Sequence, residues 1–142
     1  WTDPAPIRWM VALMPPEAVV IHGAARGADR LSGRIAQIRG LKVESYPADW
    51  AREGKAAGAI RNRRMLDQKP RLVVAFHYNL QESKGTKDCV REALRRGIDV
   101  VWVRGVDNYV IYKAKEKGKE YGKGLSGSYK RNGNNPEGTR SA

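Results

Sequence analysis

The fold is decided by residues 72–76, which read Leu-Val-Val-Ala-Phe. A continuous apolar run of this length, with β-branched residues inside it, is typical of a strand buried on both faces. Ile98–Val103 has the same character, and Ala18–Ile21 is a shorter run of the same kind. These runs predict a buried parallel sheet. The valines expected in its core are Val73, Val74, Val100 and Val101.

Segments with helical periodicity alternate with these strands. The expected helices are Pro4–Met14, a segment marked by Leu31, Ile35 and Ile38 that ends at Gly40, Ala59–Gln68, and Thr86–Arg96. Leu41–Tyr46 is expected to be a strand nearer an edge. This alternation predicts an α/β fold with a Rossmann-like, three-layer parallel sheet that has helices on both faces. A sheet of this type opens with a strand, whereas this sequence opens with a helix, so the first strand is expected before Trp1.

The end of the chain has a different composition. We expect residues 1–104 to form one domain and residues 105–142 to form a basic tail. Tyr109–Lys119 is compatible with a lysine-rich helix or with an extended arm, and Gly122–Ala142 is expected to be disordered. Lysines and tyrosines in this tail predict weak, salt-sensitive contacts with nucleic acid. A solvated extension, or an arm that orders on a second copy of the chain, remains the alternative.

The charge balance points to anionic partners. The chain carries 27 lysines and arginines against 15 aspartates and glutamates, a net charge of +12. This excess favours nucleic acid, nucleotides or an acidic surface as partners, although a margin for solubility would give the same balance. Neither a membrane-spanning run nor a secretory leader is recognisable, and the single cysteine, Cys89, fits a reducing compartment. We expect a cytoplasmic protein without a metal or cofactor.

The loop from Gly23 to Asp29 follows a predicted strand and leads into a helix. In parallel sheets, ligands bind outside the carboxyl ends of the strands. Glycine allows close approach of the backbone, and the amides at a helix start attract anions. The contacts expected with a phosphate-bearing ligand come from Gly23, Ala24, Arg26, Gly27 and Asp29. A purely structural turn, with Asp29 as a helix cap, is the alternative.

Two further segments carry candidate ligand groups. Gly85 and Thr86 follow the strand at residues 72–76, where Thr86 can cap the next helix and bond a phosphate oxygen, and Asp88 lies in the first helical turn. Arg61 and Asn62 lie in a helix in which one arginine must approach the packed side and needs an anion. A salt bridge to a carboxylate of the protein, in place of a ligand, is the alternative source of that anion. Its possible partners are Asp49, Glu53 and Asp67.

His22, which follows the predicted strand Ala18–Ile21, and three of the tryptophans are expected to have structural roles. His22 follows an apolar run, where a histidine is usually packed and hydrogen-bonded. Trp9, Trp50 and Trp102 are expected in the core rather than on a stacking surface.

Four motifs in order resemble the SLOG superfamily, the Rossmann-like group that includes the DNA-processing protein DprA and the LOG phosphoribohydrolases. They are Gly23–Leu31, Pro47–Trp50, Ala57–Leu66 and Gly85–Asp88. The resemblance covers about Trp1 to Val103 and is nearest to the small YspA-like family found in phages and bacteria. Members of that family begin with a strand and a glycine turn just before the counterpart of Trp1-Thr2-Asp3.

The resemblance implies three functions. The leading one is binding of a phosphate-bearing nucleotide or nucleotide derivative. The second is nucleotide N-glycosidase activity of the LOG type, in which Asp88 and Arg61 would be catalytic. Here Glu82-Ser83-Lys84 replaces the proline and double glycine of the LOG loop, and aspartate is shorter than the LOG glutamate. The third is single-stranded nucleic-acid binding like that of DprA. A homo-oligomer is compatible with all three.

Overall fold

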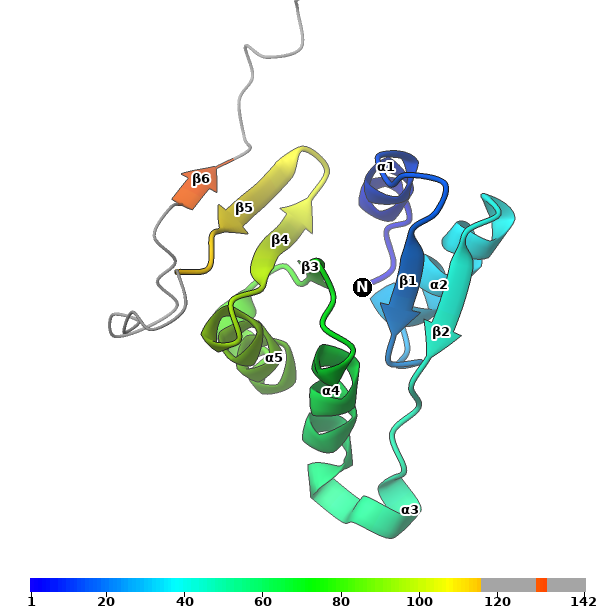
Figure 1. Cartoon of the computed structure of the whole chain (residues 1–142). Coiled ribbons are helices and arrows are strands. Elements are labelled where there is room, and N and C mark those ends of the chain that lie inside the picture. The colour runs from blue at the N-terminus through cyan, green and yellow to red at the C-terminus, as the bar shows by residue number, and fades with distance from the viewer. Residues whose placement is uncertain (116–129, 133–142) are drawn as a thin grey trace, which may run out of the picture. The chain divides into compact units, whose positions relative to one another are not determined.

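The computed structural model describes residues 1–115 and 130–132. The chain divides into two compact units, residues 1–70 and a second unit that begins at Arg71. Figure 1 shows the elements of both units, and each unit is described by itself. Within the described residues, no helix is long and apolar enough to cross a membrane.

The first unit is built on a short parallel sheet. Its elements are α1 (Ala5–Ala12), β1 (Val19–His22), α2 (Ala28–Ile38), β2 (Lys42–Ser45), α3 (Trp50–Glu53), a 3-10 turn η1 (Gly54–Ala56) and α4 (Ala57–Asp67). β1 and β2 pair in parallel, from Val19 opposite Lys42 to His22 opposite Ser45. α2 is the crossover between them, and it packs on both strands and on α1 (Figure 1).

Helix α1 shows how the sequence sets local structure in this unit. Asp3 precedes the helix and its Oδ1 accepts a hydrogen bond from the amide of Ala5 at 3.0 Å. Ile7, Met10 and Val11 form its buried face, as the helical spacing predicts. At its other end, the Arg39 guanidinium donates to the carbonyl of Val11. This contact ties the end of α1 to the end of α2.

The second unit contains a mixed sheet. Its elements are β3 (Leu72–Phe76), a 3-10 turn η2 (Leu80–Glu82), α5 (Lys84–Arg95), β4 (Asp99–Gly105), β5 (Asn108–Tyr112) and β6 (Lys130–Asn132). The strand order is β3-β4-β5-β6. β3 and β4 are parallel, whereas β4 and β5 form an antiparallel hairpin and β6 continues antiparallel to β5. α5 packs on β3 and β4.

The expected fold is confirmed as α/β but needs correction in its sheet. Parallel pairing joined by a helix occurs in both units, as predicted. Instead of one parallel sheet, however, the described residues form two sheets, and the larger one is partly antiparallel. The antiparallel part begins with β5, which lies where the sequence left a helix or an extended arm open. The chain is extended there because Asn108–Tyr112 pairs back onto β4.

Burial follows the sequence only in part. Val100 and Val101 are buried, but Val73 and Val74 are half-buried. β3 was expected to be buried on both faces, but among the described residues it pairs with β4 alone and is an edge strand. Trp9 and Trp50 are exposed, which contradicts their expected place in the core. Trp102 is half-buried, and its indole Nε1 donates to the carbonyl of His77 at 2.7 Å.

Glu92 on α5 gives the second unit a predicted sensitivity to acid. Hydrogen bonds from Arg95, and also from Arg96, lower the pKa of the Glu92 carboxyl to about 2, against 4.5 for the free group. Because the folded pKa is the lower one, the carboxylate stabilises the fold above pH 4.5, and this contribution is lost as the pH falls toward 2. Both arginines are partly exposed, so the effect is about 1 kcal/mol.

The measurement is the free energy of unfolding in urea at pH 7 and near pH 2.5, for the wild type and for Glu92→Gln. The wild type is expected to lose more stability on acidification than the variant, by about 1 kcal/mol. Equal losses would show that the Glu92 pair contributes nothing to the pH dependence.

Candidate nucleotide-binding loop

The loop between β1 and α2 is folded around the side chain of Asp29. Asp29 Oδ2 accepts hydrogen bonds from the amides of Gly23, at 3.1 Å, and Ala25, at 3.2 Å. Ala24 between them has a φ of 57° and Gly27 a φ of 84°, so the chain turns tightly twice. Asp29 therefore holds the loop and does not cap the helix, since α2 has no side-chain cap at Gly27.

His22 fixes the loop from the side of the strand. Its Nδ1 accepts a hydrogen bond from the amide of Ala24 at 3.1 Å. The far edge of the ring lies against Gly33 of α2, where an added Cβ would be 2.5 Å from Nε2. His22 is thus packed and hydrogen-bonded, as predicted. Gly33 was not foreseen from the sequence, although a glycine inside a helix is a signal of close packing.

Arg61 and Asn62 of α4 lie at the same loop. The Arg61 Nη1 donates to the carbonyl of Gly23, and its Nε donates to Asn62 Oδ1 at 2.8 Å. Gly23 is buried, and a Cβ there would run into the Arg61 side chain, so the contact as it stands leaves no room for a larger residue. One arginine of this helix was expected to approach the packed side, and Arg61, which is half-buried, is that residue. Its bonding partners are a carbonyl and an amide rather than a carboxylate.

The predicted salt bridge of this helix belongs to a different arginine. Arg64 pairs with Glu53 at 3.2 Å, which is one of the three acids that the sequence suggested. Arg61 forms no ion pair within the described part of the chain. Arg64 therefore forms the salt bridge, and Arg61 approaches the packed side; the sequence could not assign these two roles.

The part of the loop from Arg26 to Ala28 has groups left for a ligand. Arg26 is exposed and makes no ion pair with any residue in 1–115. The first amides of α2 have no partner one turn earlier, as at every helix start, and no side chain caps them. The amides of Gly23 and Ala24 are already bonded to Asp29 and His22. An anion would therefore meet Arg26 and the amides that follow it.

The other predicted contacts lie in the second unit. Ser83, not Thr86, is the N-cap of α5, because its Oγ accepts from the Thr86 amide at 3.3 Å and also donates to Thr86 Oγ1 at 2.8 Å. The expected cap at Thr86 is therefore wrong. Gly85 is exposed, and Asp88 is half-buried on the same helix. In the described residues, no group of three or more histidines, cysteines or acids could hold a metal ion.

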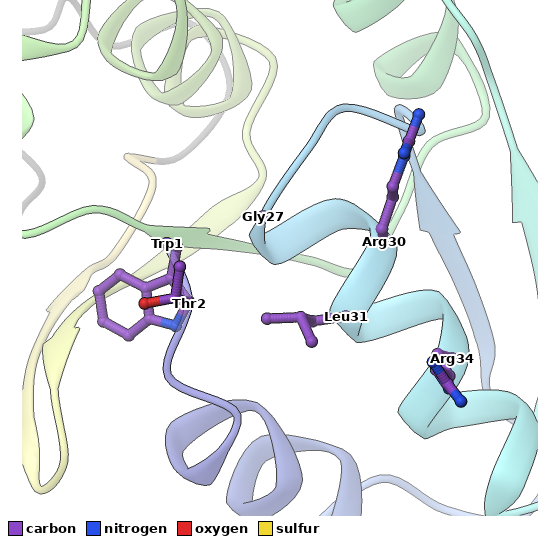
Figure 2. A pocket seen from close by; sticks show the side chains of 6 residues that line it. All are labelled: Trp1, Thr2, Gly27, Arg30, Leu31 and Arg34. Carbon is purple, nitrogen blue, oxygen red and sulfur yellow. The ribbon is translucent and has the colours of Figure 1, made fainter.

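A hollow beside the loop was not foreseen. It has a volume of about 320 Å³ and lies between the segment before α1 and the first turns of α2 (Figure 2). Leu31 points across it toward Trp1 and Thr2. Gly27 belongs to both the loop and the hollow. The complete lining is Trp1, Thr2, Gly27, Arg30, Leu31 and Arg34. The only signal in the sequence was the pair of arginines one helical turn apart around Leu31.

Comparison with known proteins places these residues in a family. Residues 6–52, which include the loop and α2, match the family described as "YspA, cpYpsA-related SLOG family". The chain is similar to the Gene 61 protein of Mycobacterium phage D29, with 41% identity over 92 residues that span 61% of this chain and 72% of the phage protein. No solved structure matches the chain. The chain belongs to the YspA, cpYpsA-related SLOG family.

Proposed function

We propose that the chain binds a phosphate-bearing nucleotide or nucleotide derivative at the loop between β1 and α2. The observation that carries the proposal is the conformation of this loop, which Asp29, His22 and Arg61 hold from three sides. Three side chains thus hydrogen-bond to a turn of only five residues. A loop fixed in this way loses little conformational entropy when it binds a ligand.

The phosphate is proposed to bind at Arg26 and the amides of Gly27 and Ala28. The start of α2 supplies partial positive charge, and Arg26 supplies a full one. Asp29 is compatible with this because its carboxylate accepts hydrogen bonds from the amides of Gly23 and Ala25, which are not the amides proposed to bind the phosphate. Gly23, Ala24 and Arg61 then act by holding the loop. Gly85 and Thr86 remain predicted contacts from the sequence, with no role in the present proposal.

Membership of the SLOG family and the net charge of +12 support an anionic, nucleotide-related ligand. The Rossmann-like arrangement implied by the family would place this loop at the carboxyl end of a sheet strand, where such ligands bind. The proposal names the class of ligand by its chemistry, which is a phosphate joined to a nucleoside.

Arg26→Ala tests the position of the phosphate. The variant is expected to bind AMP about 5- to 10-fold more weakly than the wild type, or about 1–1.4 kcal/mol, because an exposed counter-charge is lost. Arg8→Ala is the matched control, since Arg8 is an exposed arginine on α1. The measurement is calorimetric titration with AMP and, in parallel, with adenosine, which lacks the phosphate.

The control should bind AMP like the wild type, and adenosine should bind much more weakly than AMP to every variant. If Arg8→Ala weakens AMP binding as much as Arg26→Ala, the effect is general charge and not a phosphate site. Adenosine binding as tightly as AMP would contradict the proposal directly.

A further inference from the structure

Trp50, the first residue of α3, presents an exposed indole in the first unit. It is 61% exposed, whereas a tryptophan is usually well buried. The backbone at Trp50 is fixed, because Oδ1 of Asp49 accepts a hydrogen bond from the Arg52 amide at 3.1 Å and caps the short helix. The phosphate site at Arg26 does not explain why an indole is exposed at this fixed position.

The strand order brings Trp50 to the same edge of the sheet as the nucleotide loop. β1 and β2 are parallel, so the segments that follow them leave the sheet at one edge. The pairing continues up to these segments, where the Tyr46 amide donates to the His22 carbonyl at 2.8 Å. α3 lies beyond the carboxyl ends of both strands (Figure 1). Trp50 is therefore on the side of the sheet where α/β proteins bind their ligands.

Gly58 and Arg61 of α4 connect the indole with the loop. A Cβ added at Gly58 would lie 3.4 Å from Cη2 of Trp50 and 3.9 Å from Nη2 of Arg61, so both side chains border the same point of α4. The other terminal nitrogen of Arg61, Nη1, donates to the Gly23 carbonyl. One guanidinium group thus reaches both the first residue of the loop and the neighbourhood of the indole.

An exposed indole at this position can bind the part of a nucleotide that the phosphate site leaves without a partner. Arg26 and the start of α2 account for the phosphate only. Aromatic side chains stack with bases through their ring faces. A two-ring purine covers more of an indole than a one-ring pyrimidine does, so it buries more apolar surface.

We propose that Trp50 stacks with the base of the nucleotide whose phosphate binds at the start of α2, and that this contact makes the site selective for purine nucleotides. The inference rests on the proposed function, because it concerns the same ligand. It adds the base to a site in which only phosphate contacts were assigned, and it names the substrate class as purine nucleotides.

The test compares the wild type and Trp50→Ala in titrations with AMP, UMP and ribose 5-phosphate, which has the sugar and the phosphate but no base. Loss of stacking is expected to weaken AMP binding about 5- to 100-fold. The affinity for ribose 5-phosphate, followed by the amide shifts of residues 26–28, should be unchanged because this ligand does not reach the indole. The wild type should prefer AMP to UMP, and this preference should shrink in Trp50→Ala.

Two further variants separate stacking from packing on α4. Trp50→Phe keeps an aromatic ring and should retain most of the AMP affinity. Trp50→Leu keeps an apolar contact with Gly58 but cannot stack, so it should bind AMP like Trp50→Ala. Trp9→Ala removes an exposed indole of α1 and is the matched control, which should bind all three ligands like the wild type. Melting temperatures show that each variant remains folded.

Equal AMP affinities of the wild type and Trp50→Leu would overturn the stacking role and leave the phosphate site standing. An equal loss of AMP and ribose 5-phosphate binding in Trp50→Ala would also overturn it, because Trp50 would then only hold Gly58 and Arg61 in place. If adenosine binds the wild type as tightly as AMP and Trp50→Ala weakens both, the phosphate site fails and the base contact stands. No binding of AMP to the wild type would overturn both proposals.

Discussion

Arg61→Ala is expected to weaken AMP binding by about 10- to 100-fold, or about 1.5–3 kcal/mol, as for the loss of a charged hydrogen bond in a partly buried site. Arg61 is half-buried and its guanidinium holds the Gly23 carbonyl. Without it, the loop is less ordered before binding, and the conformational entropy lost on ordering it reduces the affinity for the ligand. The free energy of unfolding should fall less than the free energy of binding, because the contact braces one loop and not the core.

Gly23→Ala provides an independent way to break the same contact. An added Cβ would run into the Arg61 guanidinium, so the guanidinium must move away although the arginine is still present. Gly23→Ala and Arg61→Ala should therefore weaken AMP binding to a similar degree, and the double variant should be little worse than either one. A thermodynamic cycle of calorimetric affinities measures this coupling. Strictly additive losses would show that Arg61 acts on the ligand without acting through Gly23.

Gly27→Ala is expected to destabilise the fold by about 2–3 kcal/mol, since two penalties combine there. The φ of 84° is unfavourable for alanine, and a Cβ would lie 2.8 Å from the backbone oxygen of Trp1. Gly40→Ala is the matched control, because Gly40 has a φ of 86° and nothing lies within 4 Å of an added Cβ.

The control is expected to lose about 1 kcal/mol, the strain of a positive φ alone. Unfolding in urea, followed by circular dichroism, gives both values. The larger loss in Gly27→Ala measures the close approach of the chain at Trp1 together with the ψ of −125° at Gly27. If the two variants are equally stable, that approach contributes nothing to the fold.

The strands could be located from the sequence because each apolar run carries its own signal. The runs at residues 72–76 and 98–103 contain β3 and most of β4, and both pair in parallel as expected. Strand β5 could not be distinguished from a helix or an extended arm, because the sequence of this short segment does not show that it pairs with β4. The edge position of β3 is likewise a property of pairing and not of composition.

The loop illustrates how far residue types alone can be read. Glycines and an arginine after a strand pointed to Gly23–Asp29, and the helical spacing predicted that one arginine of residues 61–64 lies near the packed side. Which atoms meet depends on dihedral angles that the sequence does not express. Asp29 was expected to cap α2 or to contact a ligand, yet its carboxylate bonds the amides of its own loop. Trp9 and Trp50 were expected inside because of their size, and both are exposed.

Two expectations concern residues outside the described part of the chain or lie beyond what it tests. The lysines and tyrosines of residues 116–129 and 133–142 fall outside the described residues, and with them the predicted role of the tail in nucleic-acid binding. Asp88 and Arg61 belong to different units, and the N-glycosidase hypothesis that pairs them stays a prediction. Assay of free adenine released from AMP would test it.

Backbone amide spectra of the ¹⁵N-labelled chain, recorded during titration with AMP, test the nucleotide loop most directly. The amides of Arg26, Gly27 and Ala28 are expected to shift most, with a common dissociation constant. Adenosine at the same concentrations should leave them in place, because it lacks the phosphate. Shifts that appear only outside residues 23–31, or equal shifts with adenosine, would contradict a phosphate site at this loop.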